Sequence, residues 1–174
     1  MTVTASGSAQ VPVTGYQVVL APVGAPVTLM HPQADSLVVA EPDQLALWCA
    51  GTEMLTTLTV QIHDTALAPA PLSPSGLAAL TDEGHVEELL WTLRHGGPLL
   101  AYADDYGATA LDALEVPAGT WRVRVTVTGR AAAAALDEQL TSADEADFDD
   151  PGDHPPSGPV TGPEVWLLEL SPEP

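Results

Sequence analysis

Acidic side chains are the groups in this sequence best placed to do chemistry, and the first concentration of them lies between two tyrosines. Residues 102–106 read Tyr-Ala-Asp-Asp-Tyr and follow a predicted strand. Paired carboxylates beside aromatic rings can hold a cationic group or exchange protons, and the same composition also makes an ordinary polar turn. The stretch therefore supplies four candidate partner-binding residues, Tyr102, Asp104, Asp105 and Tyr106.

A second concentration of acids occupies residues 137–153, which hold eight carboxylates. The run from residue 147 resembles a calcium loop only faintly. Pro151 stands at its fifth position, and Gly158 stands at the twelfth, where a bidentate glutamate is needed. We expect loose attraction of cations and no dedicated metal site. The candidate partner-binding residues of this stretch are Asp147, Asp149 and Asp150.

Other catalytic constellations are missing from the sequence. Cys49 lies in the apolar run 45–50, which predicts a buried thiol, and no Gly-x-Ser-x-Gly elbow is present. The five histidines show no zinc-binding spacing. His63 and Asp64 can be half of an acid–base pair or a solvated strand end. Without lysine there is no phosphate-binding loop of the usual kind. We predict no catalytic residue, no metal and no cofactor.

Net charge narrows the class of partner. The 174 residues contain 24 acids, four arginines and no lysine, for a formal net charge of −20. Such a surface repels nucleic acid and anionic membranes, so we expect neither as a partner. It attracts a basic protein or divalent cations, and it also serves solubility alone.

The cysteine count and the hydropathy of the sequence indicate the cellular compartment of the protein. A single cysteine excludes an intramolecular disulfide and fits a reducing compartment. Residues 1–15 lack the basic and apolar features of a signal peptide, and no segment reaches the ~20 apolar residues of a membrane span. We expect a cytoplasmic protein.

Alternation with a period of two predicts the elements that must position these groups. Residues 119–128 and 54–63 place apolar and polar side chains on opposite faces. Further strands are expected at 16–21, 36–40, 44–50, 111–116 and 165–170. Glycine and proline clusters between them favour an antiparallel β-sandwich with at most one or two short helices. Eight residues should point inward: Trp121, Val123, Val125, Val127, Leu58, Val60, Ile62 and Trp166.

Two connections are expected to be tight hairpins. One joins 111–116 to 119–128 and sets Glu115 opposite Arg122, which assigns Arg122 and Arg124 structural roles. The other turns at Gly96 and Gly97. The preceding stretch, 81–95, also fits a capped amphipathic helix, and we favour the strand because of its neighbours.

The remaining segments define the expected domain organisation. Residues 1–10 are predicted to be a flexible N-terminus, and residues 11–174 a single domain. Residues 64–84 should be a surface excursion, and 137–163 an irregular, acidic, proline-rich insertion, preceded by a short helix at 131–140. Little apolar surface there offsets the entropy of ordering, so we expect 141–160 to be mobile.

Two motifs in the second half carry a family resemblance. Residues 116–125 read Val-Pro-Ala-Gly-Thr-Trp-Arg-Val-Arg-Val, and residues 164–170 read Glu-Val-Trp-Leu-Leu-Glu-Leu. Over about residues 86–172 this pattern resembles the competence protein J-like bacterial proteins. The resemblance implies a small β-sandwich and, because the group's named member inhibits a partner nuclease, an inhibitor-like role. It places no functional residue on this chain, and the acidic stretch departs from the compact pattern.

These observations favour a non-enzymatic protein-binding module, in the form of an inhibitor or immunity-like factor for a basic toxin or nuclease. Two alternatives remain. One is a metal-dependent hydrolase with acids near Asp104 or His63, and the other is an accessory component of a larger assembly. Between the two acidic stretches we favour Asp104 and Asp105, because a loop held between strands is better preorganised than an irregular tract. The oligomeric state stays open.

Overall fold

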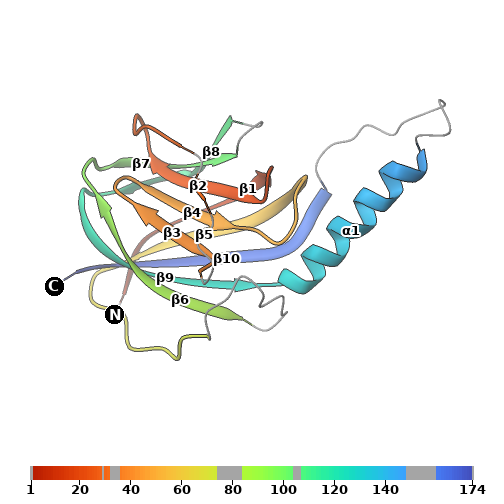
Figure 1. Cartoon of the computed structure of the whole chain (residues 1–174). Helices are drawn as coiled ribbons and strands as arrows, with labels where there is room; N and C mark the ends of the chain where they lie inside the picture. Colours follow the sequence, from red (N-terminus) through yellow and green to blue (C-terminus); the bar gives the residue numbers. More distant parts are fainter. Residues whose placement is uncertain are drawn as a thin grey trace.

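The computed structural model describes residues 2–28, 30–31, 36–73, 84–103, 107–147 and 160–173. Within these residues the chain forms ten strands and one helix, α1, which projects from one end of the strands (Figure 1). In chain order the elements are β1 Val3–Val13, β2 Gln17–Pro22, β3 Val38–Glu41, β4 Gln44–Trp48, β5 Met54–His63, β6 His85–Leu93, β7 Gly97–Ala103, β8 Gly107–Val116, β9 Gly119–Thr128, α1 Arg130–Asp147 and β10 Val160–Pro172.

The strands make two five-stranded sheets, which confirms the mainly-β, antiparallel sandwich. The first sheet has the order β1-β5-β10-β9-β6, and the second has the order β3-β4-β2-β7-β8. All neighbouring pairs are antiparallel except β5 and β10, which run parallel. The chain reaches this parallel partner only at its C-terminal end, after α1.

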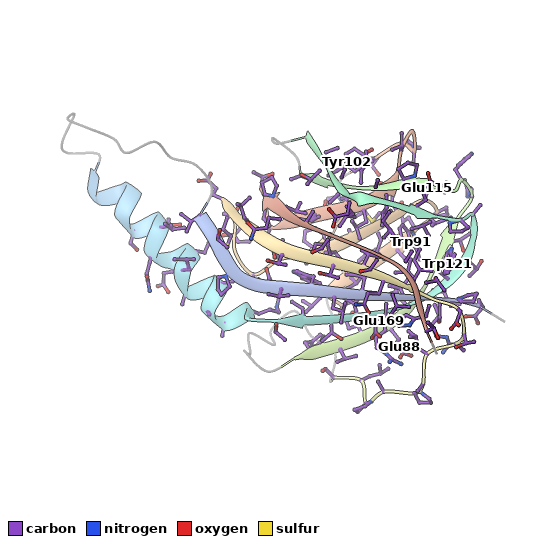
Figure 2. All side chains as sticks on the ribbon, turned by 180° about the vertical axis from the view of Figure 1, so that it is seen from behind. Glu88, Trp91, Tyr102, Glu115, Trp121 and Glu169 are labelled. Atoms are coloured by element: carbon purple, nitrogen blue, oxygen red, sulfur yellow. The ribbon has the colours of Figure 1, made fainter. Side chains whose placement is uncertain are left out.

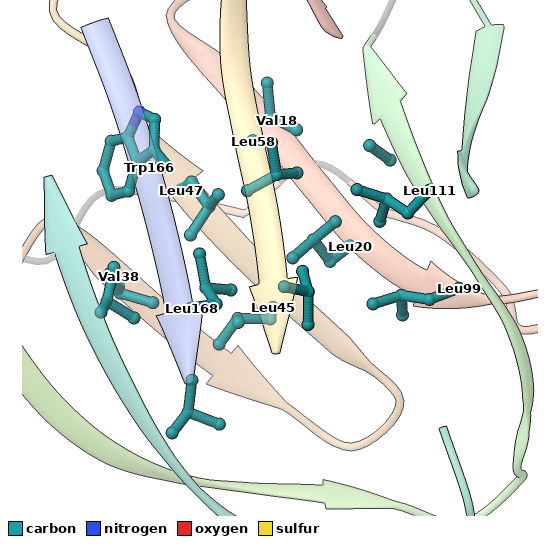
Figure 3. Close-up of a cluster of buried hydrophobic side chains, with 14 of the residues drawn as sticks. Val18, Leu20, Val38, Leu45, Leu47, Leu58, Leu99, Leu111, Trp166 and Leu168 are labelled. Carbon is teal, nitrogen blue, oxygen red and sulfur yellow. The ribbon is translucent and has the colours of Figure 1, made fainter. Parts of the chain in front are cut away.

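The core lies between the sheets, where the inward rows of both meet in one cluster (Figure 3). All eight residues predicted to point inward are buried. Trp91 and Trp121 face each other in the β6–β9 register, at the end of the sandwich remote from α1 (Figure 2). Burying each large aliphatic or aromatic side chain contributes about 1.5–3 kcal/mol, so this cluster dominates stability.

The outer face of the second sheet is also covered, which explains why all of β2 is buried. Val27 and Met30 pack on Val19 in a smaller apolar cluster on this face. The Gln17 side chain holds the covering segment, since its Nε2 donates to the Met30 carbonyl at 3.0 Å and its Oε1 accepts the Met30 N–H at 3.3 Å. Gln44 Oε1 likewise accepts the Thr28 N–H at 2.8 Å. The side-chain amides of Gln17 and Gln44 thus make the hydrogen bonds to this segment that a neighbouring strand would otherwise make.

Residues 64–73 run irregularly, as expected for the first part of the surface excursion, and residues 74–83 lie outside the described part of the chain. Leu67 of this segment is buried, and the Ala68 carbonyl accepts a hydrogen bond from the Arg124 guanidinium. Arg124 also pairs with Glu88 at 2.6 Å and lies 3.9 Å from Glu169. The structural role predicted for this arginine is therefore present in the structure.

Both predicted hairpins are wrong, because each connection crosses from one sheet to the other. β6 lies in the first sheet and β7 in the second, while β8 lies in the second and β9 in the first. Glu115 consequently pairs with Pro98, and Arg122 forms its ion pair with Glu173 at 3.6 Å. A hairpin and a corner between layers need similar glycine and proline residues, so local sequence does not separate them. The strand favoured for the stretch 81–95 is confirmed, and β6 occupies His85–Leu93.

The chain ends and the acidic insertion also differ from expectation. Residues 1–10, expected to be flexible, largely belong to β1, which pairs with β5 and so extends the first sheet. The short helix expected at 131–140 continues to Asp147, and β10 begins at Val160. The insertion predicted to be irregular over 137–163 is therefore helix at its start and strand at its end, and the mobility predicted for 141–160 stays a prediction. Residues 148–159 lie outside the described residues. Over the part of the chain that is described, no helix is both long and apolar enough to cross a membrane.

Carboxylates close the two open sides of the sandwich. On one side the Asp112 carboxylate of β8 accepts the Ser8 N–H of β1 at 2.9 Å. On the other, Glu87 of β6 accepts the Leu37 N–H at 2.8 Å. Asp43, in the β3–β4 turn, accepts the N–H of Arg94 at 2.6 Å. Each bond joins one sheet to the other where main-chain pairing stops, so the edges present few unpaired groups.

Candidate functional site

The base of α1 is anchored by a buried ion pair. Arg130 Nη1 lies 2.8 Å from Glu164 Oε1, and both side chains are almost fully buried. The same nitrogen donates to the Trp48 carbonyl at 2.7 Å, while Glu164 accepts the Ala50 N–H at 3.1 Å. Burial raises the pKa of Glu164, and the Arg130 guanidinium opposes that rise only in part. The arginine at the start of α1 thus fastens the helix to both sheets.

A second anchor lies two turns further along α1. Asp137 Oδ1 accepts the Thr52 N–H at 2.8 Å, and Asp137 Oδ2 accepts the Tyr16 hydroxyl at 2.9 Å. Seven residues are close to two full turns, so Arg130 and Asp137 lie on the same side of the helix. The hydrogen bond to Asp137 raises the pKa of Tyr16. Local sequence gave no signal for this contact, which joins residues 121 positions apart.

Tyr16 occupies an unusual place in the turn between β1 and β2. Its φ is +62° and that of Gly15 is +59°, and the Gln17 N–H donates to the Thr14 carbonyl across the turn. Left-handed backbone at both central positions is the geometry of a type I′ turn, which normally takes Asn or Gly. The Tyr16 side chain is nevertheless 44% exposed. An exposed aromatic ring is thus held at an unfavourable backbone position.

Beyond its base, α1 projects away from the sandwich (Figure 1). Glu138, Thr141 and Ser142 are exposed. The sequence of the last turns includes Asp144, Glu145 and Asp147, and no basic residue is present in the last turn. Acids at a helix C-terminus oppose the helix dipole, so this end of α1 favours a cationic neighbour.

Of the predicted residues at 102–106, Tyr102 lies at the same end of the sandwich. Tyr102 pairs with Val19 and packs, half-buried, on the outer face of the second sheet. β7 ends at Ala103, next to the start of β2 and therefore near Tyr16. Three predicted residues of this turn, Asp104, Asp105 and Tyr106, lie outside the described residues.

Only one of the three predicted partner-binding residues of the second acidic stretch lies within the described residues. Asp147 is the last residue of α1. Asp149 and Asp150 lie outside the described residues, in the segment that joins α1 to β10. Among the described residues, β7 ends, β8 begins and α1 begins at the same end of the sandwich, here called the acidic end and marked by Tyr16, Thr52, Glu53, Asp137 and Glu138.

The exposed arginine side chains lie away from the acidic end. The chain has four arginines and no lysine, and all four arginines lie within the described residues. Arg94 follows β6 at the remote end, and Arg122 pairs with Glu173 near the same end. Arg124 is held in the middle of β9 by Glu88. Arg130 is at the acidic end but is buried against Glu164, so no exposed arginine balances the acids there.

The other chemical candidates have structural roles. His63, expected to point outward, is buried, and its Nε2 lies 3.4 Å from Glu169. Asp64 accepts the Thr2 N–H at 2.9 Å, and neither ring nitrogen of His63 has a hydrogen-bond partner among the described residues. Cys49 is buried as predicted, and burial raises the pKa of its thiol well above the usual value. No group of three or more metal-ligating side chains occurs among the described residues.

Comparison with known proteins identifies the fold. No protein-family model matches the chain, and no curated protein matches it by sequence. Among solved structures, the chain is similar to ComJ from Bacillus subtilis, an inhibitor of the DNA-degrading activity of NucA, with a TM-score of 0.52 and 5% identity over 99% of this chain and 98% of that one. It is also similar to the product of crocagin biosynthetic gene J, with a TM-score of 0.50 and 15% identity over 98% of each chain. The sandwich is therefore the ComJ fold over its whole length, including the first half, where the sequence showed no resemblance.

Proposed function

We propose that this chain is a non-enzymatic, inhibitor-like protein that binds a basic protein through its acidic end. The partner class is a DNA-degrading nuclease or a related basic toxin. The observation that carries the proposal is the distribution of charge among the described residues, because Glu53 and Glu138 are exposed at the acidic end and every exposed arginine lies elsewhere.

Electrostatics explains how such an end works. A surface of one sign steers a partner of the opposite sign and raises the rate of encounter, especially at low salt. A nuclease must bind phosphate, so its substrate site offers cations that carboxylates can occupy in place of DNA. The likeness to ComJ supports the inhibitor-like role at the level of fold. The likeness to ComJ does not identify the target of this chain, so the target class named above is our proposal.

The direct test is inhibition of a purified partner. The tagged chain is expressed in its own host, and a protein that co-purifies at low salt is identified, produced separately and assayed for DNA degradation. We expect a basic protein whose activity is lost at a one-to-one ratio. About 0.5 M NaCl should slow association strongly, because salt screens exposed charges beyond about 4–5 Å at that concentration.

Matched charge reversals locate the binding end. Glu53 and Glu138 are exposed at the acidic end, and Glu41 and Glu115 are exposed at the remote end. The double variant Glu53→Lys with Glu138→Lys should slow association by about tenfold or more, as expected for steering charges. The double variant Glu41→Lys with Glu115→Lys changes the net charge equally and should bind almost as well as wild type.

Two results would contradict the proposal. If both double variants slow association equally, binding follows net charge and the acidic end has no special role. If no basic protein is recovered and the chain turns over a small molecule, with activity abolished by one Asp substitution, the enzyme alternative replaces the inhibitor.

A further inference from the structure

The outer face of the first sheet carries two neighbouring rows of side chains that contain no ionisable group. Each row runs across β5, β10 and β9, because residues paired in register point to the same face of a sheet. Val165, in the first row, is 40% exposed, and Leu167, in the second, is partly exposed. These six residues, here called the threonine face, are Thr57, Val165 and Thr128 in the first row and Thr59, Leu167 and Thr126 in the second.

The threonine face has an apolar centre and a rim of hydroxyl groups. Val165 and Leu167 lie on the middle strand, β10, and threonines lie on both neighbouring strands. β1 continues the two rows with Gln10 and Ser8, and the Ser8 hydroxyl lies 3.1 Å from the Thr59 hydroxyl. An apolar centre with a polar rim is the usual layout of a contact between proteins.

Charged residues border the threonine face at both ends of its strands. Toward the remote end, Arg122 of β9 points to the same side of the sheet, and 43% of its side chain is exposed beside Glu173. Toward the acidic end, Glu53 directly precedes β5 and is exposed. The uncharged rows therefore lie between an exposed arginine on one side and an exposed carboxylate on the other.

Two copies related by a two-fold axis can pack these faces, with their strands aligned as in other packed sheets, in two ways. An axis parallel to the strands brings the two acidic ends together, which charge repulsion opposes. An axis parallel to the rows reverses one copy, so that the acidic end of each copy meets the arginine-bearing end of the other. This second axis also sets each row against the other row, so that Val165 faces Leu167 and Thr57 faces Thr59.

We propose that the threonine face binds a second copy of this chain in the reversed orientation. A basic protein would find no carboxylate on this face, whereas a second copy supplies a matching uncharged surface and an unlike charge at each border. The inference is independent of the proposed function.

The extent of the face sets the strength of this contact. With β1 included, the two rows cover about 300 Å² per copy, at about 4.8 Å between strands and about 7 Å between outward residues. A stable interface buries about 800 Å² per partner, so the dimer is weak and transient. At micromolar concentration it dissociates, which leaves the acidic end free for the basic partner.

Sedimentation equilibrium of the full-length chain tests the proposal from about 10 μM to about 1 mM, at about 0.3 M NaCl to screen the repulsion between acidic copies. We expect the average mass to rise toward that of a dimer, with a midpoint of about 0.1 to 1 mM, as for other small interfaces. In NMR spectra the backbone amides of Thr57, Thr59 and Leu167 should shift with concentration, and that of Glu138 should not. A monomer mass at the highest concentration, or shifts centred on another surface, would overturn the proposal.

Matched variants separate the threonine face from the rest of the sheet. Val165→Glu puts a carboxylate from each copy into the apolar centre, so the dimer should weaken by at least about tenfold. Leu90→Glu is the control, because Leu90 is 53% exposed on the same side of the sheet but lies beside Arg122, outside the face. It changes the net charge equally and should dimerise like wild type. Equal weakening by the two variants would show that net charge alone governs association.

The orientation has a test of its own, because residue 165 of one copy faces residue 167 of the other. In a mixture of Val165→Lys with Leu167→Glu, a cation meets a carboxylate only in the mixed dimer. The mixture should therefore associate at least about tenfold more tightly than either variant alone. An axis parallel to the strands would not bring these positions together, so a mixture that associates no better than its components would overturn the proposal.

This proposal and the proposed function fail in different ways. If wild type stays monomeric and Val165→Glu loses binding to the basic partner protein, the face belongs to that partner and the dimer is wrong. If the dimer forms as described and no basic protein is bound, the threonine face stands and the inhibitor function falls.

Discussion

Carboxylates take the place of main-chain carbonyls at several points of this fold. Asp137 and Glu164 accept N–H groups at the base of α1, and Asp43, Glu87 and Asp112 accept them between the sheets. Each of these acids is committed to structure, so the composition overstates how many are free to meet a partner. At the scale of single residues, position rather than number decides which acids can bind.

The buried pair at the base of α1 leads to a prediction on stability. Arg130→Met leaves the Glu164 carboxylate buried without its cation, so we expect the free energy of unfolding to fall by about 3–5 kcal/mol. Chemical denaturation with urea measures it. The control is Arg122→Met, because the pair with Glu173 is much less buried than the Arg130 pair and should contribute less than about 1 kcal/mol. A loss below about 1 kcal/mol for Arg130→Met would show that the pair does not hold α1.

Asp43 should make stability depend on pH in the acid range. Burial alone would raise the Asp43 pKa, but the N–H groups of His95 and Arg94 and the His95 ring outweigh it and lower the pKa. A carboxyl with a lowered pKa stabilises the fold above its unfolded pKa of about 3.9, and the effect is lost as the pH falls through the folded value.

Asp43→Asn should therefore be less stable than wild type at pH 7, and the difference should shrink below about pH 4. The free energy of unfolding measured from pH 7 to pH 3 tests this. Glu41→Gln, a neutralisation at an exposed site two residues away, should follow the wild-type curve. A difference that stays constant with pH would remove Asp43 as the titrating group.

At the scale of elements, close backbone approach joins the sheets at their edges. β1 passes directly against β8, where a Cβ on Gly7 would collide with the Leu111 carbonyl and lie 2.9 Å from the Leu114 Cβ. Asp112 and Ala113 beside it have left-handed backbone, with φ of +46° and +57°, where the pairing of β8 with β7 shifts register. The edge strands thus cover each other, and neither is free to recruit another strand there.

Gly7→Ala should destabilise the protein by about 1–3 kcal/mol, because the added methyl group forces β1 away from β8. Thermal or urea unfolding measures the change. Gly84→Ala is the matched control, since its Cβ would lie 3.7 Å from the Thr126 and Thr128 methyl groups, at ordinary contact distance. Equal stability of the two variants would show that the β1–β8 contact has room to relax.

At the scale of the whole molecule, a sandwich with the ComJ fold carries exposed acids at the acidic end and no exposed arginine beside them. The sheets bury the apolar rows, the side-chain amides and arginines hold covering segments on both outer faces, and α1 extends from one end (Figure 1). A net charge of −20 makes copies of such a molecule repel one another. Because no exposed arginine lies at the acidic end, the carboxylates there are not balanced by nearby positive charge. The proposed function depends on this difference between the two ends of the molecule.

Sequence alone determined the strands and their inward rows, because side-chain alternation is a local property that burial on one face imposes on each strand separately. β5 and β9 begin and end at the predicted residues, and the predicted core is buried. The buried state of Cys49 followed from its apolar neighbours in the same way.

Tertiary structure alone decided which strands share a sheet and which residues meet. The same turn residues serve a hairpin within a sheet and a corner between sheets, so Glu115 and Arg122 ended on different layers. The contact of Tyr16 with Asp137 and the pairing of Arg130 with Glu164 join residues far apart in the chain. Such contacts depend on how the sheets stack and on where α1 leaves them, and no local pattern encodes that arrangement.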